Sequence, residues 1–202
     1  MEEQKIKFKI FDLYDLSEIK VADDGLQPMI NLDQRLILKS HGRNMQKMGK
    51  AKINIVERLM NKIGVAGHRG KKHKIEMGSS TGKYTTNMKL VLDALEIVAK
   101  KTGKNPVEVL VKAIENAAPR DEITVIEYGG ARYPQAVDVS PMRRVNLSLK
   151  FLIHGAGDKS FGKKKPFAQA LAEEIIMTYE RNGESFALKK KNESEKQADS
   201  AR

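Results

Sequence analysis

The sequence predicts a mainly α-helical protein with one β-hairpin, and three observations support this fold class. After residue 50, apolar residues recur at spacings of three and four, which is the period of an amphipathic helix. Gly and Pro residues interrupt this pattern at intervals, as they do between helices. Between residues 122 and 140 the period changes to two around a Gly-Gly pair, which is typical of two paired strands.

The first two helices follow from apolar stripes. One stripe predicts a helix over residues 53–63, and a long loop rich in Gly, Ser and Lys leads from it to residue 84. The next stripe predicts a helix over residues 88–98, with Thr86 or Asn87 as its N-cap.

The third helix has a clear start signal. Asn105 can cap it, Pro106 occupies the first helical position, and Glu108 lies three residues after the cap. Pro119 ends the helix, because proline cannot continue the helical hydrogen bonding.

The segment of period two predicts an exposed two-stranded arm over about residues 122–140. Gly129 and Gly130 form its turn, and Pro134 must occupy a position that donates no ladder hydrogen bond. An isolated hairpin is only marginally stable, so we expect another element to lie against it.

Two more helices complete the predicted core. Ser140 caps a helix over residues 141–153, and a linker rich in Gly and Lys separates it from a helix over residues 166–183. The chain thus divides into a partly extended N-terminal arm (1–50), a helical core with the hairpin (51–183) and a polar C-terminal tail (184–202). The tail could extend as a helix, but its polarity favours mobility.

The charge of the chain points to a polyanionic partner. Its 202 residues contain 37 Lys and Arg against 26 Asp and Glu, for a formal net charge of +11. Residues 39–74 carry eleven cations against one carboxylate, and residues 129–150 and 151–166 each carry an excess of three positive charges. Because neutralising phosphates releases their counterions, such surpluses favour nucleic acid. With no Trp and few other aromatic residues, recognition by backbone and shape fits better than base stacking.

Composition and motifs exclude several classes of protein. The absence of cysteine rules out a disulfide scaffold, a cysteine-ligated zinc module and a thiol enzyme. No apolar run reaches about eighteen residues and no secretory signal opens the chain, so we expect a cytoplasmic protein that does not bind membranes. No cofactor loop, metal-ligand pairing or nucleophile motif stands out, and we expect neither a cofactor nor enzymatic activity.

Arg143 and Arg144 are the most informative pair of cations. They lie in the first turn of a predicted helix, where the macrodipole disfavours each exposed cation by about 0.3–1 kcal/mol. A phosphate bound at that helix end would offset this cost, and a salt bridge to a carboxylate elsewhere in the fold is the alternative.

The stretch GGARYPQAVDVSPMRRVNLSLKFLI, preceded by TGKNPVEVLVKAIENAAPR, resembles the seventh protein family of the small ribosomal subunit. In that family a Thr-Gly-Lys-Asn-Pro link joins two helices, a Gly-Gly hairpin carries a Tyr and a Pro, and Val-Ser-Pro-x-Arg-Arg opens the next helix. The resemblance covers about residues 31–183. The N-terminal arm and the insertion after the first core helix resemble the archaeal and eukaryotic branch.

This resemblance implies a six-helix ribosomal-protein domain with a protruding hairpin, bound to the 3′ major domain of small-subunit rRNA. It implies that the protein nucleates assembly of the subunit head and contacts the ninth and eleventh small-subunit proteins. It also implies that the hairpin lies near the exit-site tRNA and the mRNA path.

We therefore predict a structural, rRNA-binding protein of the ribosome. Its predicted RNA contacts are the cations of the three surpluses except Lys62 and Lys159, together with the hairpin turn and Tyr133, namely Lys39, Arg43, Lys47, Lys50, Lys52, Arg58, Arg69, Lys71, Lys72, Lys74, Gly129, Gly130, Arg132, Tyr133, Arg143, Arg144, Lys150, Lys163, Lys164 and Lys165. We expect the surpluses to converge on one face of the fold. A helix-turn-helix DNA-binding regulator is the alternative, and it would bind a palindromic duplex as a dimer. An RNA-modifying enzyme is a third hypothesis, which the absence of a cofactor loop disfavours.

Overall fold

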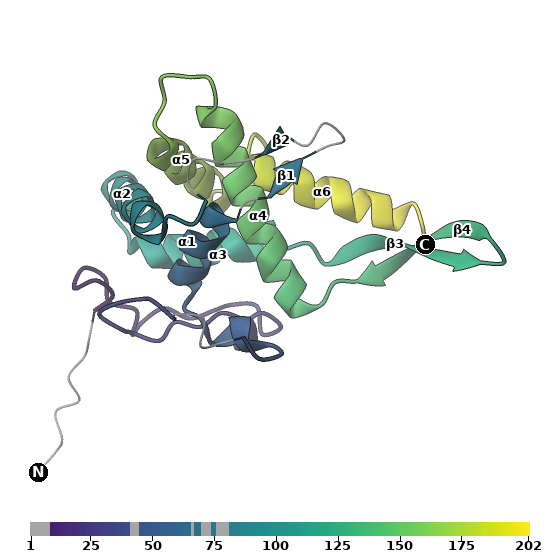
Figure 1. Cartoon of the computed structure of the whole chain (residues 1–202), viewed down its shortest axis with the longest axis horizontal. Coiled ribbons are helices and arrows are strands. Elements are labelled where there is room, and N and C mark those ends of the chain that lie inside the picture. Colours follow the sequence, from purple (N-terminus) through teal and green to yellow (C-terminus); the bar gives the residue numbers. More distant parts are fainter. Residues whose placement is uncertain (1–8, 41–44, 66, 70–73, 76–80) are drawn as a thin grey trace, which may run out of the picture.

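The computed structural model describes residues 9–40, 45–65, 67–69, 74–75 and 81–202. These residues form six α-helices, two short 3-10 helices and two β-hairpins, and Figure 1 shows the larger hairpin projecting from one side of the helical body. The predicted fold class, mainly α with a protruding hairpin, is confirmed.

The elements follow one another as a short irregular start and then a run of helices broken by two hairpins. In chain order they are η1 (Gln27–Met29), η2 (Gly49–Lys52), α1 (Ile55–Gly64), β1 (His68–Arg69), β2 (Lys74–Ile75), α2 (Tyr84–Thr102), α3 (Pro106–Ala117), β3 (Asp121–Tyr128), β4 (Ala131–Asp138), α4 (Pro141–Ser160), α5 (Phe167–Tyr179) and α6 (Phe186–Asp199).

Helix α5 lies at the centre of the helical body. It contacts α2, α3, α4 and α6, and its Leu171 and Ile175 are fully buried. The apolar stripes that predict the other helices also contribute to the core, as Leu59, Leu95 and Leu110 show by their burial. The predicted cap of α3 is confirmed, because the Asn105 side chain accepts a hydrogen bond from the main-chain N–H of Val107.

The larger hairpin has the register that its Gly-Gly turn predicts. Tyr128 pairs with Ala131 next to the turn, and Ile126 pairs with Tyr133 further along. Gly129 and Gly130 have φ angles of 59° and 81°, which favour glycine. As expected, another element lies against the base of this hairpin: α6 contacts β3 (Figure 1).

The N-terminal arm packs against the helices although it has little regular structure. Its Leu16, Leu26 and Leu38 side chains are buried, and in Figure 1 it runs along one edge of the body beneath α1 and α4. Polar contacts fix its course, because Asn105 donates a hydrogen bond to the carbonyl of Asp15 and Glu115 accepts one from the amide of Ala22.

Two predicted helix boundaries are wrong. Helix α2 begins at Tyr84, before the predicted caps Thr86 and Asn87, and the Tyr84 hydroxyl donates to the carbonyl of Leu38 in the arm. Helix α5 ends at Tyr179 instead of running to residue 183. Contacts with distant segments set these ends, and local sequence signals do not report such contacts.

The predicted linker after residue 153 is also wrong, because α4 continues to Ser160. Its Gly155 lies where three helices meet: a Cβ there would be 2.8 Å from Glu174 Cδ in α5 and 2.9 Å from Phe186 Cβ in α6. Glycine at this position permits close packing inside a helix, although its usual effect in sequence is to interrupt one.

The C-terminal segment 184–202, expected as a polar tail, contains α6. Ser185 caps this helix by accepting a hydrogen bond from the amide of Leu188, and Ala187 and Ala198 are buried. The carboxylate of Glu174 in α5 accepts hydrogen bonds from the Ser185 hydroxyl at 2.8 Å and the Ala187 amide at 3.1 Å. Tertiary contacts thus order a segment whose composition alone favours mobility.

Candidate functional site

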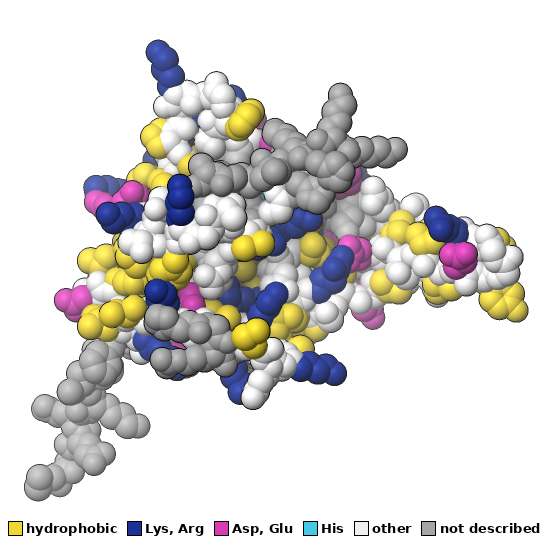
Figure 2. Space-filling view, viewed as in Figure 1, with side chains coloured by type: hydrophobic (Ala, Val, Ile, Leu, Met, Phe, Trp, Pro, Cys, Tyr) yellow, Lys and Arg dark blue, Asp and Glu magenta, His cyan; other side chains and the backbone are white. Residues whose placement is uncertain are grey.

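A basic surface forms where η2, α1 and α4 meet. It is defined by Lys50 in η2, Lys62 in the last turn of α1 and Lys150 in the middle of α4. Figure 2 shows Lys and Arg side chains gathered in the middle of the face over α1 and α4. Within the described part of the chain, no carboxylate forms an ion pair with any of these three lysines.

The three lysines of this basic surface are near enough to one another to affect the titration of Lys62. Burial lowers the pKa of Lys62, and the charges of Lys150 and Lys50 lower it further. Because like charges that lie close together repel each other, a bound polyanion would stabilise all three ammonium groups. This surface is therefore suited to binding phosphates.

Arg143 and Arg144 are both held by carboxylates. Arg143 donates from Nε and Nη2 to the two oxygens of Glu122 in β3, at 2.6 and 2.7 Å. Arg144 Nη2 lies 2.8 Å from Asp23 Oδ2 in the arm. In the isolated chain, salt bridges to carboxylates thus offset the unfavourable interaction of these two cations with the helix dipole at the start of α4. This is the alternative that the sequence analysis gave to a bound phosphate.

These ion pairs shift the titration of their carboxylates. The hydrogen bond and the charge of Arg143 lower the pKa of Glu122 despite its partial burial. Burial acts to raise the pKa of Asp23, but the hydrogen bond and charge of Arg144, with the amides of Gly25 and Leu26, lower it overall. Both carboxylates are thus stabilised in the charged form.

The predicted contact at Arg58 needs correction, because this side chain is buried. Only 5% of the residue is exposed, and its guanidinium donates to the carbonyl of Met29 at 2.6 Å and to Asn146 Oδ1 at 3.1 Å. Burial lowers the pKa of Arg58 to about 10. Arg58 therefore joins the arm to α4 and is not available to a phosphate. The apolar residues on both sides of Arg58 in the sequence, among them Val56 and Leu59, are a local sign that this arginine lies against the core.

The tip of the larger hairpin carries exposed side chains of mixed character. Tyr128 is 82% exposed and Tyr133 59%, and the exposed guanidinium of Arg132 lies 3.6 Å from Glu127. Figure 2 shows hydrophobic side chains on the projecting hairpin. Aromatic rings and an arginine on an exposed arm can stack on unpaired RNA bases.

The remaining predicted cations lie on both sides of the basic surface. Lys39, Lys47 and Lys52 are exposed around η2 and the arm, with Lys39 Nζ 5.3 Å from the centre of the Tyr84 ring. Lys163 and Lys164 are exposed in the loop after α4, and Lys165 is paired with Glu173.

The three charge surpluses converge only in part. The first and second meet at Lys50, Lys62 and Lys150, whereas the third follows the far end of α4. At 1.5 Å per residue, Arg143 and Ser160 at the two ends of α4 are about 25 Å apart. The expectation of a single compact face therefore holds only for parts of the first two surpluses, because along α4 Arg143, Arg144 and Lys159 are paired with carboxylates and Lys150 is not.

Some predicted contacts lie outside the described residues or are described only by their backbone. Arg43, Lys71 and Lys72 lie outside the described residues. Arg69 and Lys74 pair with each other across the short β1–β2 ribbon. The loop that the sequence predicts between the first two helices thus contains a two-stranded element.

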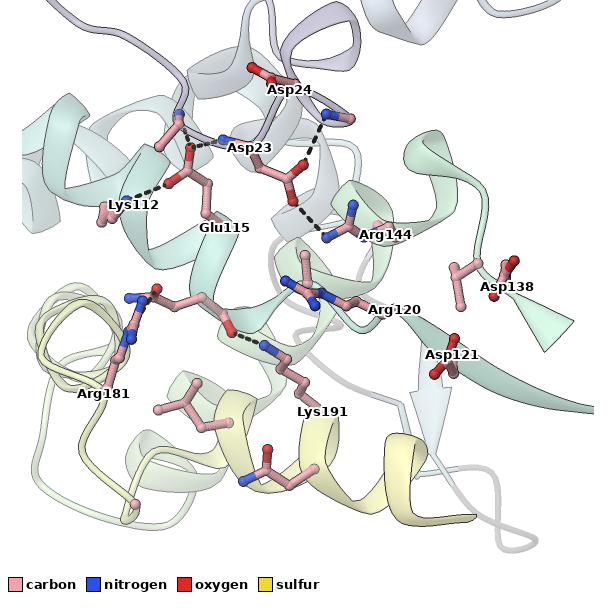
Figure 3. A pocket seen from close by; sticks show the side chains of 18 residues that line it. Asp23, Asp24, Lys112, Glu115, Arg120, Asp121, Asp138, Arg144, Arg181 and Lys191 are labelled. Atoms are coloured by element: carbon pink, nitrogen blue, oxygen red, sulfur yellow. Dashed lines mark hydrogen bonds and ion pairs between the residues drawn. The ribbon is translucent and has the colours of Figure 1, made fainter. Parts of the chain in front are cut away.

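A second group of cations was missed by the sequence analysis. Arg120, Arg181 and Lys191 line one cavity together with Arg144, as Figure 3 shows. They come from the link between α3 and β3, the loop after α5, and α6. Their separation along the chain leaves no local signal that could have brought them together.

The described residues contain no cluster of three or more His, Asp or Glu side chains arranged to hold a metal ion. Among these residues, no helix is both long enough and apolar enough to cross a membrane.

Comparison with known proteins identifies the family of the chain. The sequence model of the family "Ribosomal protein S7p/S5e" matches residues 32–202. The chain belongs to this family. Its relatives include the small ribosomal subunit protein uS7 of Nanoarchaeum equitans, 49% identical over 200 residues, which cover 98% of this chain and 100% of the relative. The uS7 proteins of Methanosphaera stadtmanae and Cenarchaeum symbiosum are 45% and 42% identical over 97% and 96% of this chain, and the aligned parts cover 100% and 96% of those proteins.

Family membership confirms the resemblance seen in the sequence, and the archaeal relatives agree with the archaeal and eukaryotic branch that it indicated. The match extends to residue 202 and therefore includes α6, which lies beyond the stretch that carries the resemblance in sequence.

Proposed function

We propose that this chain is a structural constituent of the small ribosomal subunit and that it binds small-subunit rRNA directly. The observation that carries the proposal is the basic surface of Lys50, Lys62 and Lys150, where three cations from separate elements repel one another without a carboxylate partner among the described residues. A folded RNA backbone supplies the phosphates that would neutralise them.

The S7p/S5e family and the archaeal uS7 relatives support the ribosomal setting of this surface. We assign the 3′ major domain of the rRNA as the binding site and nucleation of head assembly as the role, with the ribosome in the cytoplasm as the location. The exposed Lys163 and Lys164, in the loop after α4, would contact RNA separately from the basic surface.

The larger hairpin has a separate part in the proposal. It would lie near the exit-site tRNA and the mRNA path, with Tyr128, Arg132 and Tyr133 towards RNA. Their exposure on a projecting arm supports this placement, because the side chains can reach a ligand that the helical body does not touch. The ninth and eleventh small-subunit proteins are the proposed protein neighbours.

A helix-turn-helix DNA regulator remains the alternative, and a binding experiment separates the two hypotheses. The purified full-length chain is mixed at moderate ionic strength with the 3′ major domain of small-subunit rRNA and, separately, with a DNA duplex of equal length. We expect protection of a defined set of rRNA nucleotides from chemical probes, and weaker binding to the duplex that does not depend on its sequence. Equal affinity for the two nucleic acids, with no defined footprint, would rule out the proposal.

A further inference from the structure

The cavity shown in Figure 3 lies apart from the basic surface, since Lys50, Lys62 and Lys150 are not among its lining residues. Its volume is about 1090 Å³, and its walls are residues 22–25 of the arm, α3, the start of β3, the first turn of α4, the loop after α5, and α6. This concave surface is therefore built from both ends of the chain.

Three cations of this cavity lack an acidic partner among the described residues. Lys191 Nζ donates to the main-chain carbonyl of Asn116 at 2.9 Å, and Arg181 Nε donates to the side-chain oxygen of the same Asn116 at 3.2 Å, so both partners are neutral. The main-chain amide of Arg120 donates to Glu195, and its guanidinium makes no hydrogen bond or ion pair within the described part of the chain.

The three cations are close enough to influence one another. Burial lowers the pKa of Lys191, and although Glu195 raises it, the charges of Arg120, Arg144 and Arg181 lower it further. An anion placed among them would relieve this repulsion.

The acidic groups of the same cavity are either already paired or stand at its edge. Asp23 is paired with Arg144, and Glu115 accepts from Lys112 at 3.0 Å and from the amide of Ala22 at 2.6 Å. Asp121 is paired with Arg202 at 2.7 Å. Asp24 and Asp138 remain, and Figure 3 shows them at the margins, while Arg120 and Lys191 point towards the middle. The cavity therefore has a cationic centre and an acidic rim.

From this charge pattern we infer that the cavity binds an acidic side chain carried on a short segment of another protein. The guanidinium groups of Arg120 and Arg181 can each hold a carboxylate through paired hydrogen bonds. A peptide can place one carboxylate at the centre and a neutral or basic residue opposite Asp24 and Asp138. RNA fits less well, because it carries a phosphate at every nucleotide and would bring further negative charge to that rim. The inference goes beyond the proposed rRNA contact and does not depend on it.

The test uses two hexapeptides of identical composition and no net charge, so that the charge of +11 on the protein does not by itself attract them. The first is acetyl-Lys-Gly-Glu-Glu-Gly-Lys-amide, with its acids in the centre, and the second is acetyl-Glu-Gly-Lys-Lys-Gly-Glu-amide, with its acids outside. Each is titrated into ¹⁵N-labelled full-length protein while the arginine Nε–H resonances are followed by NMR. Pentauridylate is titrated as the RNA probe.

We expect the first peptide to give saturable shifts at Arg120 and Arg181, and the second to give none. The double variant Arg120→Gln and Arg181→Gln should weaken binding at least about tenfold, since it removes both guanidinium contacts. Its affinity is measured from the backbone amide resonances of the same ¹⁵N-labelled protein, because the variant lacks these two Nε–H groups. Because both side chains are exposed, this variant should fold normally, which a thermal melt verifies. The matched control Lys89→Gln with Lys189→Gln removes two exposed cations outside the cavity and should leave peptide binding unchanged.

Two results would overturn the inference. If pentauridylate shifts Arg120 and Arg181 and displaces the peptide, the cavity is a further RNA contact. If no probe moves these resonances, or both peptides move them equally, the cavity has no preference for a central carboxylate. A defined rRNA footprint is expected with either result, because the proposed function is tested by that footprint and not by the peptides, so failure here can be told apart from failure of the proposed function.

Discussion

Removal of the three lysines of the basic surface should change how rRNA binding responds to salt. The variant carries Lys50→Gln, Lys62→Gln and Lys150→Gln and so removes the positive charges that lie close together on this surface. Each cation that neutralises a phosphate contributes about 0.9 to the slope of log affinity against log salt concentration, taking the duplex value. Loss of three such contacts should make that slope shallower by about 2.7.

This change in slope can be measured as a ratio of wild-type to variant affinity for rRNA. Between 50 and 200 mM salt the concentration changes about fourfold. The ratio of the wild-type affinity for rRNA to that of the variant should therefore fall roughly fortyfold over this range. Filter binding or fluorescence anisotropy with the rRNA domain gives both affinities across this range. The free energy of unfolding should stay within about 0.5 kcal/mol of the wild-type value, because exposed or half-buried lysines are replaced and mutual repulsion is relieved.

A control separates this effect from the overall charge. Lys89→Gln, Lys100→Gln and Lys189→Gln together also lower the formal net charge by three, from +11 to +8, at exposed positions outside the basic surface. The slope for this control should change by much less than for the surface variant. Equal changes in the two variants, or an unchanged slope in the surface variant, would refute the assignment of these lysines to phosphates.

Three further predictions concern stability and the positions that the structure reassigns. Gly155→Ala should lower the free energy of unfolding by about 1–3 kcal/mol, measured by urea denaturation, because the added methyl would collide with Glu174; wild-type stability would disprove the close approach of α4 and α5. Arg58→Ala should cost about 1–3 kcal/mol of stability while leaving the salt dependence of rRNA binding unchanged, so a shallower salt slope with intact stability would restore Arg58 as an RNA contact. Glu122→Gln should make the stability of the protein less sensitive to acid. The pKa of Glu122 is lowered in the folded state, so its ion pair with Arg143 stabilises the fold above about pH 4.5. This stabilisation is lost as the pH falls through the folded-state pKa. The wild-type protein should thus lose up to about 1 kcal/mol more than this variant between pH 6 and 3 in urea titrations, and parallel pH profiles would contradict the ion pair.

The elements best predicted from sequence are those whose signals are local. The cap and first-turn proline of α3 act within four residues, and the turn of the larger hairpin depends on Gly129 and Gly130 themselves. Apolar periodicity correctly places the buried faces of α1, α2 and α5, since a helix stripe needs only a core to cover it. Charge composition is likewise a property of the chain itself, and it is sufficient to indicate a polyanionic partner.

Features that depend on contacts between residues far apart in the sequence could not be predicted from the sequence. Whether Gly155 breaks a helix or lets three helices approach depends on Glu174 and Phe186. The polar C-terminal segment becomes α6 because Glu174 of α5 binds its first residues and because α4 and β3 pack against it. The partner of Arg144 lies 121 residues away along the chain, at Asp23.

Contacts between distant residues also give the cations of this protein different roles. Sequence counts Arg58 and Lys62 alike as positive charges, but folding buries the first among protein oxygens and places the second beside two other lysines. It also gathers Arg120, Arg181 and Lys191 from segments with no common pattern. Composition reports how much charge a chain carries, whereas the local potential that a ligand meets depends on distances and burial, which arise only when the chain is packed.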